Sequence, residues 1–174
     1  MMLVLHILCL ICTLNFVVGW EWVNDYDGDM YFECPRGKAI SYLYSTHHNR
    51  HEDRKWALEC RSTGSESHSC YKTPHYVNDW DEFFSFECNN SGFICGMDSI
   101  HDNRREDRRF RFQCCSIAGK DLSQCYRTWR NRYDYPDSVR VPNGYVIRGV
   151  SSTHDNRKED RRYSWEVCQL VNRG

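Results

Sequence analysis

The sequence has no excess of either charge and, beyond its first residues, no long hydrophobic run. It carries 23 Lys and Arg against 24 Asp and Glu, so it lacks the one-signed basic field that proteins use to bind nucleic acid. After residue 19 there is no apolar stretch of about 18 residues, the length that a membrane-spanning helix requires. We therefore expect neither nucleic-acid binding nor a membrane span.

Motifs of common enzyme classes are also missing. The chain contains no Gly-x-Ser-x-Gly, no His-Glu-x-x-His and no phosphate-binding P-loop. Its carboxylates stand among arginines, which lower carboxylate pKa values and make poor general acids. We expect no enzymatic activity and no cofactor.

The one apolar run of the chain lies at residues 3–18. It is too short and too poorly flanked to be a membrane span. It predicts a secretory signal peptide over residues 1–19, followed by a single domain over residues 20–174. We therefore expect a secreted, extracellular protein.

Cysteine is abundant and odd in number. Of 11 cysteines, Cys9 and Cys12 lie in the expected leader, so nine remain in the domain. In a secreted chain this density indicates a disulfide framework. An odd number leaves one thiol over.

A charged motif occurs three times. Residues 47–60, 101–114 and 154–168 read HHNRHEDRKWALEC, HDNRREDRRFRFQC and HDNRKEDRRYSWEVC, at spacings of 54 and 53 residues. Repetition at such a period indicates an array of one supersecondary unit. The repeats extend approximately over residues 22–60, 77–114 and 130–168.

The end of each repeat has the period of a half-buried strand. Trp56 and Leu58 alternate with polar or small residues, as do Phe110 and Phe112. No amphipathic helical pattern of three turns is visible. We expect an all-β fold made of three degenerate repeats with pseudo-threefold organisation, barrel- or prism-like, stabilised by disulfides and bearing long charged loops.

These residues carry a family resemblance. The Asp-Arg-x-aromatic element before a cysteine resembles the signature of the dermatopontin family, as do the opening Trp22-Val23-Asn24 and the vicinal Cys114-Cys115. The resemblance covers essentially the whole mature chain and is closest to the family's invertebrate branch. The element stands at Asp53-Arg54-Lys55-Trp56, Asp107-Arg108-Arg109-Phe110 and Asp160-Arg161-Arg162-Tyr163.

The resemblance implies a non-enzymatic adhesive protein that agglutinates or aggregates cells by multivalent binding to cell-surface or matrix glycans and proteoglycans. The alternative is a matrix-organising protein that binds proteoglycan or collagen without lectin activity. Integrin-type receptors are further partners that the family implies. Crosslinking could come from three sites on one chain or from homo-oligomers.

The resemblance also implies four disulfides, namely Cys34–Cys60, Cys70–Cys114, Cys88–Cys115 and Cys125–Cys168. Internal symmetry instead pairs Cys88 with Cys114, the copies of Cys34 and Cys60. The family pairing is preferred here because the vicinal cysteines of a strand point to opposite faces.

Cys95 is then the odd thiol. It aligns with Ser41 and Arg148 in the other repeats, so we expect it to be exposed, and either free or bridged to another molecule. Asn89 opens an Asn-Asn-Ser sequon on a predicted turn and is a candidate glycosylation site.

Polar residues of the three charged loops are the candidate ligand contacts, since side chains on long surface loops do not pack into the core. Guanidinium groups there suit sulfate or carboxylate groups of glycans. For the Asp-Arg pairs a structural role is the competing interpretation, in which each pair locks its loop. The candidates are Asn49, Arg50, Asp53, Arg54, Asn103, Arg104, Asp107, Arg108, Asn156, Arg157, Asp160 and Arg161.

We expect no metal binding. His47, His101 and His154 occupy one repeat position that a threefold axis could gather, but zinc needs converging ligands. Asp25, Asp27 and Asp29 mimic the start of an EF-hand loop, whose twelfth position here is an arginine.

Overall fold

The computed structural model describes residues 21–174, and the predicted leader lies outside them. The all-β prediction is confirmed for this part of the chain, in which no helix is long and apolar enough to cross a membrane. The strands are β1 (Met30–Glu33), β2 (Lys38–His48), β3 (Asp53–Ser62), β4 (His68–Lys72), β5 (Phe84–Glu87), β6 (Phe93–Asp102), β7 (Asp107–Ile117), β8 (Lys120–Arg127), β9 (Asp137–Arg140), β10 (Tyr145–Asp155) and β11 (Asp160–Asn172).

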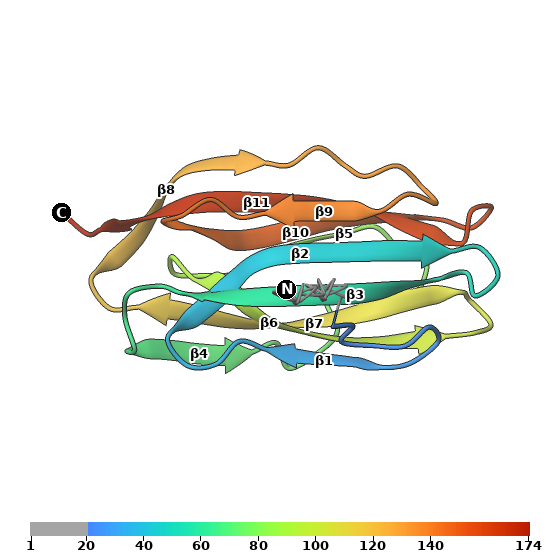
Figure 1. Ribbon diagram of the computed structural model, residues 1–174, viewed down its shortest axis with the longest axis horizontal. Coiled ribbons are helices and arrows are strands. Elements are labelled where there is room, and N and C mark those ends of the chain that lie inside the picture. The colour runs from blue at the N-terminus through green and yellow to red at the C-terminus, as the bar shows by residue number, and fades with distance from the viewer. Residues whose placement is uncertain (1–20) are drawn as a thin grey trace, which may run out of the picture.

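Three antiparallel sheets are built around three long hairpins, β2–β3, β6–β7 and β10–β11 (Figure 1). The strand orders are β3-β2-β9, β1-β6-β7-β4 and β5-β10-β11-β8. The short first strand of each repeat pairs with the hairpin of another repeat: β1 with β6, β5 with β10, and β9 with β2. The repeats are therefore interlocked by backbone hydrogen bonds.

A β-bulge falls at the same place in the first strand of each hairpin. The register shifts after Ile40 in β2, after Ile94 in β6 and after Ile147 in β10. An extra residue in one strand bends it and increases its twist. All three isoleucines are at most 1% exposed, so each bulge keeps the preceding side chain in the core.

The core lies between the sheets and is aromatic. Trp56 packs edge-on against Phe110 and Tyr163, with ring centroids 6.3 and 5.1 Å away. These three occupy one repeat position and are at most 2% exposed, as the period-two alternation predicts. Burying side chains of this size contributes roughly 1.5–3 kcal/mol each.

Buried asparagines hold the entries of the first two repeats against their hairpins. Asn24 accepts the Trp56 backbone N–H at 2.8 Å and donates to the Arg54 carbonyl at 2.9 Å. Asn78 makes the same pair of contacts with Phe110 and Arg108. Each amide thus satisfies backbone groups that would otherwise be buried unpaired.

Three disulfides connect strands of the framework, and one corrects a prediction. Cys34–Cys60 and Cys125–Cys168 occur as the family resemblance implies. Cys88 bonds to Cys114 instead of Cys115, so the pairing suggested by internal symmetry holds. Cys114 points into the main core, where the Cys88 side chain also lies.

The other vicinal cysteine faces the opposite side of β7. There Cys115 lies directly across from Cys70 in the β4–β7 register, so the expected Cys70–Cys114 bridge is wrong and Cys70 bonds to Cys115. The Cys115 sulfur is also within bonding distance of Cys95. Three sulfurs therefore share one position, and one disulfide at a time can form on Cys115.

The expectation that Cys95 is exposed is wrong. Cys95 is the extra residue of the β6 bulge and its alignment with Ser41 and Arg148 is correct, yet it is only 2% exposed. Cys95 packs in a second small apolar cluster, which includes Phe93 and Ile117 together with Ala39 of β2 and Val146 of β10. Strand alternation sends the side chain away from the main core, but not into solvent.

Candidate binding surface at the hairpin tips

A closed cycle of buried ion pairs ties the bases of the three hairpins together. In each pair an arginine donates from Nε and Nη2 to the two carboxylate oxygens of an aspartate, at 2.6–2.8 Å. Every arginine pairs with the aspartate of a different repeat, and all six residues are at most 4% exposed. Such forked, charge-assisted contacts are the strong ones. The pairs are Arg54–Asp160, Arg108–Asp53 and Arg161–Asp107.

The same aspartates also hold the loops that enter each repeat. The Oδ2 atom of each accepts a backbone N–H at 2.8 Å, from Asp27, Asp81 or Asp134. Burial alone would raise the pKa of Asp160, but neighbouring His47 and Arg54 outweigh it and hold that pKa below its usual range.

The six Asp-Arg residues are buried and paired, which favours the structural interpretation of these pairs over ligand binding. Their polar atoms are taken up by one another and by the backbone, and the cavity that they help to line measures about 20 Å³. That volume is close to what one water molecule occupies, and it is too small for a sugar ring.

Three glutamates line the outer side of this small cavity. Glu52, Glu106 and Glu159 each end a hairpin turn in the left-handed region, with φ of 48°, 44° and 43°. Residues other than glycine adopt this region at a cost of about 1–2 kcal/mol. Burial raises the pKa of Glu106 and Glu159; their histidine neighbours oppose the rise, and Glu52 adds to it. The three carboxylates thus lie close enough to repel one another.

The equivalent histidines are buried beneath the glutamates. The side chains of His47, His101 and His154 are at most 1% exposed and lie beside carboxylates at 3.3–3.9 Å. They do not converge on one point: the groups of potential metal ligands within residues 21–174 are Asp27–Asp53–His101 and His68–Cys70–Cys115. In the first group, both Asp53 oxygens already accept from Arg108.

The hairpin tips, residues 48–52, 102–106 and 155–159, lie together at one end of the molecule (Figure 1, right). Each turn is fixed by its own backbone and first side chain: Arg104 donates its backbone N–H to Asp102 at 3.0 Å, and Arg157 donates to Asp155 at 2.9 Å. The exposed candidates of the sequence analysis all lie here: Asn49, Arg50, Asn103, Arg104, Asn156 and Arg157.

The tip arginines have side chains that are free to meet a ligand. In the described part of the chain, the guanidinium groups of Arg50 and Arg104 form no hydrogen bond or ion pair, and that of Arg157 is 93% exposed beside Asp155. The asparagines are less free, because the Oδ1 atoms of Asn103 and Asn156 face buried histidine rings at 3.2–3.3 Å.

Each tip is flanked by an aromatic ring with a cation over its face, a feature that sequence reasoning missed. Lys55 lies 5.1 Å from the Tyr26 ring centroid, Arg109 5.4 Å from Trp80, and Arg162 4.4 Å from Tyr133. The three rings stand 54 and 53 residues apart, so the repeat spacing itself could have identified them. Cation–π pairs of this kind contribute about 0.5–1 kcal/mol at exposed sites.

Two further aromatic side chains are exposed between β8 and β9: Trp129 is 96% exposed and Tyr135 is 59% exposed. Asn89 is exposed on the turn between β5 and β6, next to the bridged Cys88.

Comparison with known proteins matches the chain to one family. The Dermatopontin family model matches residues 24–172. The chain is 43% identical to the hemagglutinin/amebocyte aggregation factor of Limulus polyphemus, covering 95% of this chain and 96% of that protein. It is 36% identical to Millepora cytotoxin-1 of Millepora dichotoma, over 84% of this chain and 65% of that one, and 35% identical to dermatopontin of Biomphalaria glabrata, over 79% and 93%. No solved structure matches it.

Proposed function

Because the chain belongs to the dermatopontin family, we propose that it is a secreted adhesive protein that agglutinates cells through several weak contacts with anionic glycans of cell surfaces or matrix. The observation that carries this proposal is the hairpin-tip surface, where three repeats present exposed arginines at one end of the molecule. The disulfide framework and the leader expected at residues 1–19 support secretion.

Anionic glycans suit the chemistry of the tips. A guanidinium group on a rigid turn can donate two parallel hydrogen bonds to one sulfate or carboxylate. The aromatic rings of Tyr26, Trp80 and Tyr133 stand beside the tips, and the cations over their faces, Lys55, Arg109 and Arg162, add positive charge there. The relative named as a hemagglutinin and aggregation factor supports agglutination as the outcome.

We also propose that the three repeats are related by pseudo-threefold symmetry. The cyclic order of the Asp-Arg pairs, the three equivalent bulges and the interlocked short strands support this organisation. It accounts for three similar binding tips around one axis.

The placement of the tips bears on how cells would be crosslinked. Three contacts at one end engage a single surface, where avidity can exceed the affinity of one contact by 10²–10⁴. Joining two cells requires two such ends. Agglutination by this chain therefore implies a homo-oligomer with tips pointing outward from more than one end.

Red-cell agglutination by the full chain tests the proposal. Replacing Arg50, Arg104 and Arg157 together with Ala should weaken agglutination far more than any single replacement, because two remaining tips retain avidity. The matched control removes three exposed arginines away from the tips, Arg127, Arg140 and Arg173, and should agglutinate like the unmodified protein.

Competing glycans add specificity to the same assay. A sulfated glycan should inhibit at lower concentration than its unsulfated counterpart. Equal loss of agglutination in the tip variant and the control variant would contradict the proposal. Faster collagen fibril growth without any agglutination would instead support the matrix-organising alternative.

A further inference from the structure

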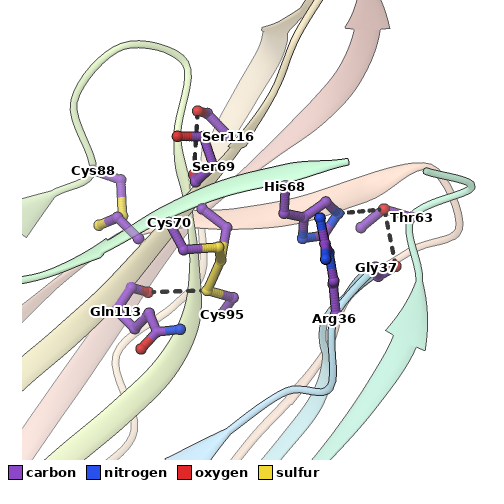
Figure 2. The surroundings of a disulfide bond; sticks show 12 residues. Arg36, Gly37, Thr63, His68, Ser69, Cys70, Cys88, Cys95, Gln113 and Ser116 are labelled. Carbon is purple, nitrogen blue, oxygen red and sulfur yellow. Dashed lines mark hydrogen bonds between the residues drawn. A yellow bond between two sulfur atoms is a disulfide. The ribbon is translucent and has the colours of Figure 1, made fainter. Parts of the chain in front are cut away.

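Three cysteine sulfurs meet on the face of β7 that points away from the main core. The Cys115 sulfur of β7 lies within bonding distance of both Cys70 of β4 and Cys95 in the β6 bulge. Figure 2 shows Cys70 and Cys95 side by side, with the Cys95 sulfur 3.5 Å from the Gln113 carbonyl oxygen. Since a sulfur forms one disulfide at a time, this group holds one bridge and one thiol.

The two arrangements differ in where the thiol lies. With Cys70–Cys115 formed, the thiol is on Cys95, which is 2% exposed within an apolar cluster. With Cys95–Cys115 formed, the thiol is on Cys70, an exposed residue of β4, whose only sheet partner is β7. A buried apolar thiol is inert, whereas an exposed one reacts as its thiolate.

The surroundings of Cys70 favour a thiolate. Cys70 and Cys115 line an open groove of about 290 Å³ together with three basic side chains, Arg36, Lys38 and His68, and with Glu33, whose carboxylate is paired with Lys72. One ring nitrogen of His68 lies within 4.8 Å of both sulfurs, and the ring is oriented by the Thr63 hydroxyl at 2.9 Å (Figure 2). Nearby cations lower the pKa of a thiol, and burial lowers the pKa of His68, which favours the neutral ring able to accept a proton.

We propose that Cys115 is the shared sulfur of an exchangeable disulfide, and that exchange makes Cys70 a surface modification site that forms a mixed disulfide with a low-molecular-weight disulfide. The cations of the groove suit an anionic molecule of this class, such as oxidised glutathione. The site is independent of the hairpin tips, which lie on the β2–β3, β6–β7 and β10–β11 turns.

The exchange balances without any added oxidant. The Cys95 thiolate attacks the Cys115 sulfur, the Cys95–Cys115 bond forms, and the Cys70–Cys115 bond breaks with Cys70 leaving as the thiolate. The proton lost by Cys95 is taken up by Cys70 or by the groove histidine. In the second step the Cys70 thiolate attacks the external disulfide, forms the mixed disulfide, and releases one external thiolate, so that the external molecule is the oxidant.

A peptide map of the acid-quenched full chain tests the proposal. Cleavage after Lys and Arg places Cys70 in peptide 62–72, both Cys88 and Cys95 in peptide 73–104, and both Cys114 and Cys115 in peptide 112–120. Peptide 62–72 should therefore be found in two forms, linked to 112–120 and unlinked. After incubation of the folded protein with oxidised glutathione it should be recovered wholly as the mixed disulfide.

Two outcomes, each showing no disulfide exchange, would overturn the proposal. In the first, peptide 62–72 is always linked and a thiol is detected only after unfolding. In the second, it is never linked, even before any reagent is added.

Matched serine variants separate exchange from simple exposure. Cys95→Ser and Cys70→Ser each leave eight cysteines within residues 20–174 and one possible bridge at Cys115, so neither should take up glutathione while folded. Glutathione bound at Cys70 in the Cys95→Ser variant would contradict the proposal, because that variant lacks the Cys95 sulfur that displaces Cys70 from Cys115. If either variant fails to fold, the map of the unmodified chain still decides.

Discussion

Arg108 donates from Nε and Nη2 to both carboxylate oxygens of Asp53, at 2.6 Å each, although the two residues stand 55 positions apart in the sequence. Asp53 belongs to the first repeat and Arg108 to the second, and the same link connects the second repeat to the third and the third to the first. The Asp-Arg element that recurs in this sequence therefore links the three repeats to one another.

Breaking one link should destabilise the whole fold. Asp53→Asn leaves Arg108 buried without its counter-charge, and losing one partner of a buried pair costs about 3–5 kcal/mol. Urea unfolding should show that loss, whereas Arg50→Ala at an exposed tip should stay within about 0.5 kcal/mol of the unmodified protein.

The double variant Asp53→Asn with Arg108→Met checks the cause. It removes the unpaired charge, so it should recover part of the stability lost in the single variant. A single variant as stable as the unmodified protein would show that the pair contributes nothing to folding.

Glu106→Gln should stabilise the protein at neutral pH. The pKa of Glu106 is raised above its usual 4.5 by burial and by neighbouring carboxylates, so the folded state binds a proton more tightly than the unfolded chain. Ionised Glu106 therefore lowers the free energy of unfolding. This loss of stability is absent at pH values below the pKa of the unfolded chain and develops as the pH rises through the pKa of the folded state. Thermal unfolding should therefore show a gain for the variant at pH 7 that shrinks below about pH 4.5.

The control for that experiment is Glu59→Gln, at an exposed position of β3 away from the cavity. It should change stability little at either pH. A gain for Glu106→Gln that is the same at pH 4 and pH 7 would exclude carboxylate repulsion as the cause.

Binding to a sulfated glycan should weaken as salt rises. The tip arginines are exposed, and the screening length falls from about 8 Å at 0.15 M to about 3 Å at 1 M ionic strength. Titration of immobilised sulfated glycan at several salt concentrations measures this directly. The triple tip variant should show a shallower dependence, and salt-independent binding by the unmodified chain would indicate neutral sugars instead.

Equivalent positions and core side chains could be predicted from the sequence alone. A strand alternates with a fixed period of two, so Trp56, Phe110 and Tyr163 could be assigned to the core from their spacing, and all three are at most 2% exposed. The all-β class and the Cys34–Cys60 bridge could be expected from the residues and the family resemblance. These features depend on local periodicity or on a motif that is copied intact.

What packs against each strand face could not be predicted from the sequence, because it depends on long-range packing. Strand alternation predicts that Cys114 and Cys115 point in opposite directions. It does not predict that Cys88 lies on the core side and that Cys70 and Cys95 lie on the other side. It says that Cys95 leaves the main core, but not that a second cluster covers it. The pairing of Arg108 with Asp53 of another repeat could not be predicted either. Long-range packing brings these two residues together, and the residue spacing within a strand carries no information about such partners.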